Sequence, residues 1–258
     1  MSDTPTGRFC WYELMTTDPG AAPGFYQAVT GWSTEGWEGG SDPYTMWVNG
    51  DTPLGGIMEL PEEARDQGAP PHWLPYISTP DIEDTTTKAK DLGASVLVGP
   101  MELPEVGAIT VLQDPQGAVF SAFQPATSTP GHDGPPAVGE FSWHELATTD
   151  WESAWAFYSE LFGWQRGDAM DMGEMGTYQM YHRGAHPLGG VFNKPPHMPA
   201  PCWILYVRVA DVAAAAGQVT AMGGKVLNGP MEVPGGDLIV QCTDPQGAMF
   251  ALHQTAPS

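Results

Sequence analysis

Apolar and polar residues alternate along "FCWYELM" (9–15). An alternation of period two predicts a strand with one buried face. Helical spacing is clearest in "DWESAWAFYSELFGW" (150–164), where apolar side chains recur every three or four residues. These side chains are Trp151, Ala154, Trp155, Tyr158, Leu161 and Phe162. In the similar segment that follows residue 17, Asp18 is predicted to cap a helix and Gly31 to end it.

Two further apolar runs, "WLPYIST" (73–79) and "WILYVRV" (203–209), also predict strands. Each run leads into a predicted helix, over 81–93 and over 211–223, that opens on an aspartate and closes near a glycine. Two or three short strands are predicted after each helix. The hydrophobic pattern therefore predicts a mixture of helices and strands, repeated along the chain.

The sequence contains a tandem repeat. Residues 7–32 align without a gap with residues 139–164, and half of these 26 positions are identical. Shorter matches follow in the same order along both halves. A repeat unit of about 130 residues is too long for a solenoid and typical of a whole domain. We therefore predict a first domain at 1–125, a Pro- and Gly-rich linker at 126–138 and a second domain at 139–258.

Two four-residue motifs occur once in each half. They are "PLGG" (53–56 and 187–190) and "DPQG" (114–117 and 244–247). Both are predicted to form turns, because glycine adopts the positive φ that other residues resist. No lysine follows either motif as a nucleotide-binding loop would require, so neither is interpreted as a phosphate site.

The chain is strongly acidic, with nine basic and 31 acidic side chains and a formal net charge of −22. Such a surface repels nucleic acids and anionic membranes. We expect no secretory signal, and no stretch approaches the roughly 20 apolar residues that cross a bilayer. Cys10, Cys202 and Cys242 lack the spacing of a zinc site or a disulfide framework. We expect reduced thiols, a cytoplasmic location, and no nucleic-acid or membrane partner.

Several features occur in the same order in both halves: the opening strand, "TTD…FY…GW", a mid-domain helix ending in "LGA" or "MGG", and "DPQG" before a last strand. This order resembles the vicinal-oxygen-chelate superfamily of glyoxalase I, bleomycin-resistance and extradiol-dioxygenase-like proteins. The paired "W-x-E-L-x-T-x-D" openings resemble its tandem two-domain actinobacterial branch, whose members are labelled hydroxylases or glyoxalase-like antigens. The resemblance implies an α+β fold in which each domain has two βαβββ modules. These modules would curl a mixed sheet around a cavity, with helices outside.

Enzymes of this superfamily usually hold a divalent metal with His, Glu or Gln from three strands. The resemblance places the corresponding positions at side chains that do not coordinate zinc, iron or magnesium in that way. These positions are Trp11, Leu74 and Ser121 in the first half, and Trp143, Ile204 and Ala251 in the second. We therefore predict no metal cofactor. A shifted site that uses Glu145 with His253 is the alternative.

Two glutamates are the candidates for proton transfer. Because strand residues alternate between faces, Glu13 and Glu145 are predicted to share the cavity side with Trp11 and Trp143. A carboxyl group beside an indole in an apolar pocket has its pKa raised by desolvation, which suits general acid–base catalysis without a metal. The alternative for each glutamate is a buried carboxylate that is bonded to backbone amides and only braces the fold.

The second half is the better candidate for chemistry. Glu145 is predicted to be the acid–base residue, assisted by His253 or His182, which occur only in this half. Each imidazole could instead have a structural role. Tyr12 and His144 occupy the alternate strand positions, and we predict that they face the covering helix and differ only in packing.

The predicted ligand-binding residues are mostly aromatic, sulfur-containing or hydrogen-bonding side chains on the same strands. The alternative for the aromatic members is a role as core fillers. They are Trp143, Tyr178, Met180, Tyr206, Arg208 and Met249 in the second half, and Trp11, Glu13, Met46, Tyr76, Ser121 and Phe123 in the first.

The function predicted from these residues is metal-independent acid–base catalysis. The reaction would be a dehydration, cyclisation or isomerisation of a hydrophobic aromatic or polyketide-like molecule in secondary metabolism, carried out by a monomer or homodimer. The first alternative is a non-catalytic protein that binds and sequesters a drug or metabolite. The second is a metal-dependent glyoxalase or dioxygenase.

Overall fold

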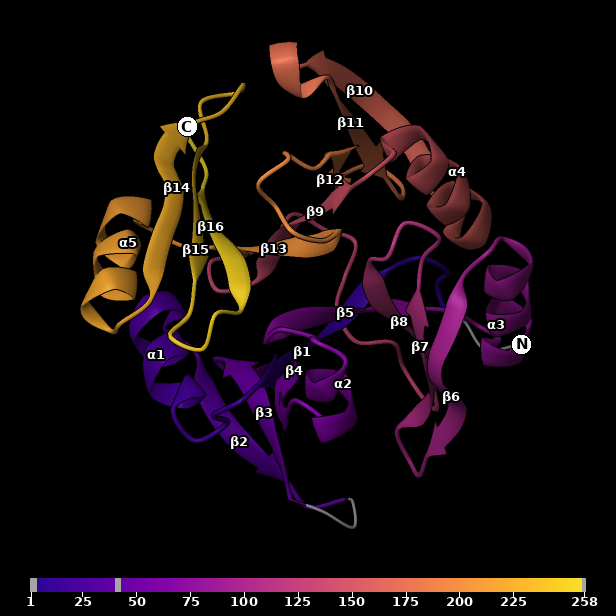
Figure 1. Ribbon diagram of the computed structural model, residues 1–258. Coiled ribbons are helices and arrows are strands. Elements are labelled where there is room, and N and C mark those ends of the chain that lie inside the picture. Colours follow the sequence, from indigo (N-terminus) through magenta and orange to yellow (C-terminus); the bar gives the residue numbers. More distant parts are fainter. Residues whose placement is uncertain (1–3, 40–42, 257–258) are drawn as a thin grey trace. The chain divides into compact units, whose positions relative to one another are not determined.

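The structure is a computed structural model that describes residues 4–39 and 43–256 (Figure 1). The predicted domain ends at residues 1 and 258 lie outside these ranges. Strands and helices follow nearly the same order in both halves of the chain. No helix in the described ranges has the length and apolar character needed to span a bilayer.

The first half contains β1 (Phe9–Thr16), α1 (Ala22–Thr30), β2 (Ser33–Trp37), β3 (Tyr44–Asn49), β4 (Thr52–Glu59), α2 (Glu62–Asp66), β5 (His72–Ser78), α3 (Ile82–Asp91), β6 (Ser95–Leu103), β7 (Gly107–Gln113) and β8 (Val119–Pro125). The second half contains β9 (Phe141–Thr148), α4 (Trp151–Phe162), β10 (Gln165–Asp171), η1 (Gly173–Met175), β11 (Thr177–His182), β12 (Pro187–Asn193), β13 (Cys202–Arg208), α5 (Val212–Ala221), β14 (Lys225–Glu232), β15 (Leu238–Thr243) and β16 (Met249–Gln254).

The strands form two eight-stranded mixed sheets. Their orders are β2-β3-β4-β1-β5-β8-β7-β6 and β10-β11-β12-β9-β13-β16-β15-β14. The pairs β1–β4 and β5–β8 run parallel in the first sheet, as do β9–β12 and β13–β16 in the second. The prediction of an α+β fold, with a strand, a helix and three strands in each module, is confirmed.

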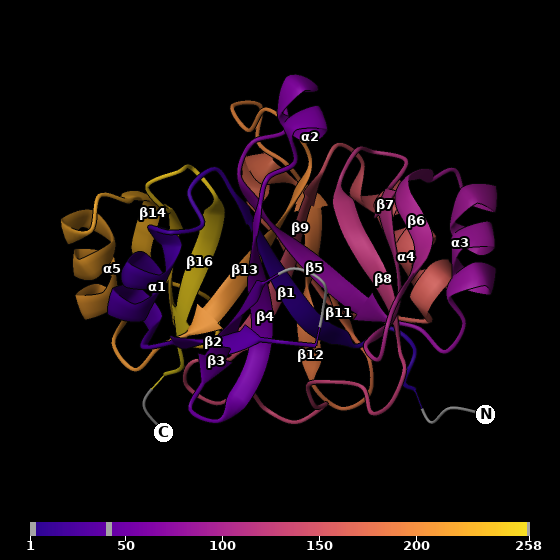
Figure 2. The ribbon, with the colours of Figure 1, turned by 90° about the horizontal axis from the view of Figure 1, so that it is seen from below.

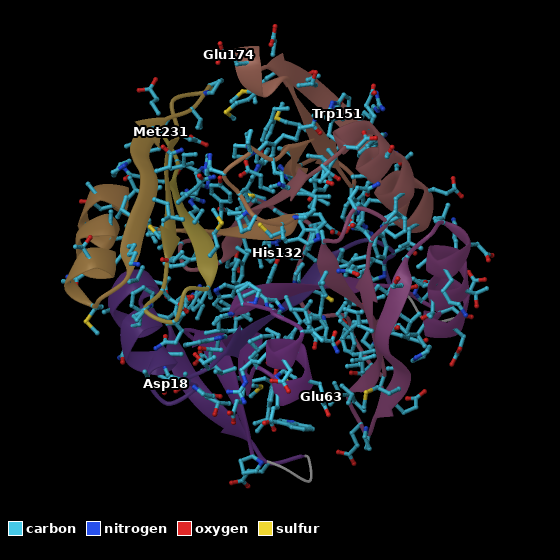
Figure 3. The ribbon with its side chains drawn as sticks, viewed as in Figure 1. Asp18, Glu63, His132, Trp151, Glu174 and Met231 are labelled. Carbon is cyan, nitrogen blue, oxygen red and sulfur yellow. The ribbon has the colours of Figure 1, made fainter. Side chains whose placement is uncertain are left out.

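Helix α4 follows the predicted pattern. The Asp150 carboxylate accepts hydrogen bonds from the first-turn amides of Glu152 and Ser153, and Gly163 ends the helix in the left-handed region at φ 69°. The apolar face is buried, whereas Trp151 lies on the half-exposed first turn (Figure 3). The Arg166 guanidinium lies 5.6 Å from the centre of the Trp151 ring. Sequence alone therefore located this helix correctly.

The start of helix α1 differs from the prediction. Asp18 does not cap it, because the helix begins only at Ala22, preceded by Ala21. The Asp18 carboxylate instead accepts the amide of Ala21 at 3.0 Å in a turn. Pro19, Gly20 and Ala21 lie between Asp18 and the helix. Glycine in particular forms helix poorly, so the helix starts later than predicted. Gly31 ends the helix at φ 81°, as predicted.

The described chain divides by contact into two compact units, and each unit combines parts of both halves. Unit 1 comprises residues 1–11, 74–134 and 143–203, and unit 2 comprises residues 12–73, 135–142 and 204–258. In unit 2, helix α1 packs beside α5, and in unit 1, α3 packs beside α4 (Figures 1 and 2). Each unit is thus built around elements that are distant in sequence.

A buried tyrosine–aspartate contact joins the two halves inside unit 2. The Tyr26 hydroxyl on α1 donates to Asp244 Oδ2 at 3.1 Å, and Trp73 Nε1 donates to the Tyr26 oxygen at 2.9 Å. The neighbouring Phe25 meets Phe250 edge-on, with ring centres 5.9 Å apart. The Phe25–Tyr26 pair of the first half thus contacts the "DPQG" aspartate and the strand that follows this motif in the second half.

Unit 1 contains the reciprocal contact. The Tyr158 hydroxyl on α4 donates to Asp114 Oδ2 at 3.0 Å. Asp114 Oδ1 accepts the amides of Gln116, Gly117 and Ala118 at 2.7–2.9 Å, which closes the predicted turn around Gly117 at φ 110°. The turn prediction for "DPQG" is confirmed. Its aspartate has the additional role, not predicted, of binding the tyrosine of the other half.

The differing residues of the repeated opening strands have matching partners. His144 stacks on Phe9 with ring centres 3.8 Å apart, and Tyr12 stacks on Phe141 at 3.7 Å. Each ring therefore packs on the phenylalanine of the other half's opening strand. That the two rings also face the covering helix stays a prediction. Burial lowers the pKa of His144 to about 4, against a bond from its ring to the Leu188 carbonyl that raises it.

Candidate functional site

Three side chains of unit 1 form a hydrogen-bonded chain. Trp143 and Glu145 lie on β9, and Tyr178 lies on β11. Trp143 Nε1 donates to the Tyr178 hydroxyl at 2.7 Å, and that hydroxyl donates to Glu145 Oε1 at 2.8 Å. Glu145 is only 7% exposed. We call this arrangement the indole–phenol–carboxylate chain.

The second glycine of "PLGG" makes this chain possible. In the sheet, Gly190 on β12 lies between Met180 on β11 and Glu145 on β9. A Cβ atom at Gly190 would lie 2.1 Å from ring carbons of Tyr178. Only a residue without a side chain lets the phenol lie across β12 to reach the glutamate.

The prediction that "PLGG" forms a turn is therefore wrong. Both copies lie inside strands, β4 and β12. The first glycine of the second copy, Gly189, also permits a close approach, since a Cβ there would lie 1.8 Å from the His144 carbonyl oxygen. Glycine inside a strand can mark a close approach of another chain segment, and the position of the neighbouring strands shows that it does so here.

Unit 2 holds the equivalent arrangement from the first half. The Tyr44 hydroxyl on β3 donates to the Glu13 carboxylate, with distances of 2.9 and 3.1 Å to its two oxygens. Glu13 is 3% exposed. A Cβ at Gly56 would lie 1.9 Å from the Tyr44 hydroxyl oxygen. Tyr44 was missed as a site residue, although the repeat of "YTM" and "YQM" aligns it with Tyr178.

Further groups surround Glu145. Phe192 on β12 stacks on the Tyr178 ring with centres 5.7 Å apart. Burial raises the pKa of the Cys202 thiol to about 11, and the negative charge of Glu145 adds to this shift while Lys194 opposes it. The Glu145 carboxylate is thus close enough to the half-buried Cys202 thiol to influence its pKa.

The predicted site residues are divided between the two units. Unit 1 holds Trp11, Tyr76, Ser121, Phe123, Trp143, Glu145, Tyr178, Met180 and His182, and unit 2 holds Glu13, Met46, Tyr206, Arg208, Met249 and His253. Among these, the structure joins Trp143, Tyr178 and Glu145 by hydrogen bonds. Tyr76 and Phe123 meet edge-on, with ring centres 6.4 Å apart.

Several predicted ligand-binding residues bond to their own unit. The buried Ser121 hydroxyl donates to the Thr110 carbonyl at 3.2 Å. The Tyr206 hydroxyl accepts a bond from Gln241 at 3.0 Å. Arg208 donates to the Pro136 carbonyl and to the Thr255 hydroxyl. These contacts give each side chain a defined position, and their role in ligand binding stays a prediction.

The two predicted assisting histidines have different surroundings. His182 Nδ1 lies 2.9 Å from the Gly184 carbonyl oxygen, and Nε2 lies 3.2 Å from that of Arg166. Its ring nitrogens therefore face backbone at the end of β11. His253 contacts the side chains of Ser142 and Asp237 in unit 2. Their catalytic assistance to Glu145 stays a prediction.

The positions that the superfamily uses for metal ligands do not suit a metal. Trp11, Trp143, Leu74, Ile204 and Ala251 carry no lone-pair donor of the required kind, and the Ser121 hydroxyl is bonded to backbone carbonyls. Within residues 4–39 and 43–256, no three His, Cys, Asp or Glu side chains are grouped to hold an ion. The donor set therefore does not fit the metal that the resemblance implies.

The indole–phenol–carboxylate chain has the components of a proton-transfer site. A carboxylate can accept a proton from a substrate and return it, and a bonded phenol holds one carboxylate oxygen in place. The indole donates to the phenol oxygen, which leaves the phenol proton directed at Glu145. The geometry supports acid–base chemistry at the Glu145 carboxylate.

Family models match both halves of the chain. Residues 140–252 match the glyoxalase/bleomycin resistance protein/dioxygenase superfamily, and residues 11–123 match a glyoxalase-like domain. CFP32 of Mycobacterium tuberculosis, named as a glyoxylase, is 30% identical over 96% of this chain and 94% of that protein. The anthracycline biosynthesis protein DauV of Streptomyces sp. (strain C5) is 27% identical over 95% of this chain and 92% of that protein.

Solved structures share the fold. The Mn(II)-bound glyoxalase from Novosphingobium aromaticivorans superposes with a TM-score of 0.66 at 14% identity, over 98% of this chain and 83% of that one. A homoprotocatechuate 2,3-dioxygenase variant from B. fuscum gives 0.67 at 14% identity, over 99% of this chain and 73% of that one. At this identity the likeness concerns the fold alone.

Proposed function

Because the chain belongs to the glyoxalase/bleomycin resistance protein/dioxygenase superfamily, we propose that it is a metal-independent acid–base enzyme of the lyase or isomerase type. Glu145 transfers the proton, and the substrate is a hydrophobic aromatic or polyketide-like molecule of secondary metabolism. The observation that carries this proposal is the indole–phenol–carboxylate chain of unit 1.

The proton transfer uses the groups of this chain. The ionised Glu145 takes a proton from a carbon next to a substrate carbonyl and delivers it to another atom of the same molecule. Tyr178 keeps the carboxylate oriented through its 2.8 Å bond, and Trp143 keeps the phenol oriented. Isomerisation, dehydration and aldol-type cyclisation all follow from such a transfer, and they differ only in what leaves or bonds afterwards.

The substrate class is supported by two observations. Two further aromatic side chains, Trp143 and Phe192, contact Tyr178, the phenol that bonds to Glu145. Planar faces of this kind stack with aromatic ligands. In addition, DauV and DnrV, which match over more than nine-tenths of this chain, are named anthracycline biosynthesis proteins. An anthraquinone-type polyketide ketone is therefore the probe of choice.

Substitution of Glu145 by Gln tests the catalytic assignment. We expect turnover of the polyketide probe, followed by mass spectrometry in deuterated water, to fall by about 10²–10⁴-fold, because the amide cannot accept the proton. Binding, followed by tryptophan fluorescence, should change little, since Gln keeps an oxygen that accepts the Tyr178 bond.

Glu13→Gln is the matched control from the first half. It removes the equivalent carboxylate of unit 2 and should leave turnover unchanged. Turnover that is lost in Glu13→Gln and retained in Glu145→Gln would contradict the choice of the second half. Probe recovered unaltered from the wild type, with no deuterium exchanged, would favour a binding protein instead.

Metal independence has its own test. Turnover of the same probe should persist after exhaustive treatment with a chelator, because the superfamily's ligand positions carry indole, aliphatic and small side chains here. Activity that is lost with the chelator and restored by Mn²⁺, Fe²⁺ or Zn²⁺ would show that a metal takes part.

Two further predictions remain proposals. A cytoplasmic location is supported by the three cysteines, which are all unpaired. The lack of nucleic-acid and membrane partners is supported by the net charge of −22, and a monomer or homodimer stays a prediction.

A further inference from the structure

A serine, a histidine and an aspartate are linked in unit 2, in a cluster separate from the hydrogen bonds of Glu145. The Ser142 hydroxyl lies 2.9 Å from His253 Nδ1, and His253 Nε2 lies 2.9 Å from Asp237 Oδ2. The three side chains come from the start of β9, the end of β16 and the residue before β15. His253 and Asp237 retain 13% and 36% side-chain exposure, and Ser142 is half-buried, so the cluster is partly exposed.

The hydrogen bonds select one tautomer of the imidazole. The Asp237 carboxylate can only accept a hydrogen bond, so the neutral imidazole carries its N–H at Nε2, the nitrogen that faces Asp237. Nδ1 is then an acceptor, and the nearest donor is the Ser142 hydroxyl. The Tyr206 carbonyl, at 3.3 Å, is a longer alternative for that hydroxyl. The serine proton is therefore directed at a base that a carboxylate orients.

Asp237 is held ionised by its surroundings. Burial acts to raise its pKa, but the bond from the Ala256 amide at 2.8 Å, the contact with His253 and the charge of Arg208 bring the pKa below its ordinary value. Arg208 lies directly opposite His253 in the parallel pairing of β13 and β16. The cluster thus combines a negative orienting group with a nearby positive charge.

The first half shows that the fold does not need this cluster. At the aligned positions it carries Cys10, Phe123 and Gly107. Cys10 occupies the same local position as Ser142: its Sγ lies 3.5 Å from the Tyr76 carbonyl oxygen, as the Ser142 oxygen lies 3.3 Å from that of Tyr206. The strand packing is therefore satisfied without an imidazole or a carboxylate, and the polar trio is an addition to the second half.

We infer that Ser142, His253 and Asp237 form a nucleophile–base–carboxylate triad that hydrolyses small carboxylic esters. Such triads are recognised by the roles and geometry of their members and occur on unrelated folds. Ser142 and His253 are the catalytic residues, and Asp237 is the positioning residue. This activity is independent of the proton transfer proposed for Glu145.

The reaction conserves atoms and protons. The Ser142 oxygen forms a bond to the ester carbonyl carbon while its proton passes to His253 Nδ1. The bond from carbon to the alcohol oxygen then breaks, and the imidazolium returns the proton to the departing alkoxide. A water molecule, deprotonated by the same nitrogen, cleaves the acyl–serine ester and restores the hydroxyl.

A fluorophosphonate tests the nucleophile in the full-length protein. It forms a stable bond from phosphorus to an activated serine and releases fluoride. We expect stoichiometric labelling of the wild type on the peptide that contains Ser142, identified by mass spectrometry, and hydrolysis of p-nitrophenyl acetate that the label abolishes. Ser142→Ala should show neither. Wild type that stays unlabelled at Ser142 overturns the inference, whatever the folding of the variants.

The other members are tested by rates and pH dependence. His253→Gln should slow labelling at least about 100-fold, because it removes the base. Asp237→Asn should slow labelling and also change its pH profile, which a purely structural role would not do. Labelling that is unaffected by His253→Gln contradicts the triad. Glu145→Gln should label like the wild type, so failure of the proton-transfer proposal and failure of this one are distinguishable.

Discussion

At the residue scale, the exchange of Tyr12 for His144 has a physical consequence. Both rings stack on a phenylalanine of the opposite opening strand. Only the histidine can take up a proton at moderately acidic pH, and it is 5% exposed. The two halves therefore share a packing solution but differ in their response to acid.

His144 is expected to make folding stability pH-dependent. Burial lowers its pKa from about 6.5 to about 4, so above pH 6.5 the ring is neutral in both folded and unfolded chains. As the pH falls from about 6.5 to about 4, His144 binds a proton in the unfolded chain but stays neutral in the folded chain. This difference corresponds to about 3 kcal/mol of lost stability.

His144→Tyr copies the first half and removes this contribution. Urea unfolding between pH 7.5 and 4 should show a shallower loss of stability than in the wild type. Equal slopes in the two proteins would mean that other groups set the acid response. Bonds from Arg8 and Arg183 hold the pKa of Asp133 at about 2. Because both proteins contain Asp133, its contribution cancels in the comparison.

At the scale of elements, helices α1 and α4 are each tied to the "DPQG" turn of the other half. Burial raises the pKa of both Asp114 and Asp244, while the bonds from amides and tyrosine oppose that shift. The tyrosines have pKa values well above the ordinary one, again mainly through burial, so they remain proton donors. These paired contacts explain why "FY" and "DPQG" recur together in the repeat.

Tyr158→Phe should destabilise the protein by about 1.5–3 kcal/mol, because the buried carboxylate of Asp114 loses the hydrogen bond that the tyrosine donates. Tyr26→Phe is the matched variant for Asp244 and should cost a similar amount. Since the two contacts lie in different units, the costs in the double variant should add, as measured by urea unfolding. A loss below 0.5 kcal/mol in both single variants, on the order of a surface substitution, would show that the hydroxyls contribute only packing.

At the scale of the whole molecule, the repeat and the compact units do not coincide. Each family model matches one half of the sequence, whereas each unit takes segments from both. The predicted domains at 1–125 and 139–258 therefore describe the duplicated unit of sequence. Whether either of them is also a folding unit stays a prediction.

The contacts of Tyr26 and Tyr158 lead to a specific expectation for truncated chains. A chain of residues 1–125 lacks the partners of Tyr26 and Asp114, and it should form no stable monomer. Light scattering and circular dichroism should show an unfolded chain or a dimer, and co-expression with 139–258 should restore the native complex. A monomer of 1–125 with cooperative thermal unfolding would contradict this expectation.

The candidate site was predictable only in part. Glu145, Tyr178 and Trp143 could each be selected from the strand pattern and the repeat. Their mutual hydrogen bonds could not, because Tyr178 and Glu145 are 33 residues apart and meet across a third strand. "PLGG" was misread as a turn for the same reason, since the atoms that exclude a side chain there belong to other strands.

The sequence by itself determined the repeat, the order of helices and strands, and local turns such as Asp114–Gly117. These features depend on backbone preferences and periodicity over a few residues. Only the tertiary structure decided which residues bond to which: Tyr26 with Asp244, His144 with Phe9, and Ser142 with His253. Such contacts depend on how distant strands and helices pack, and no local propensity encodes them.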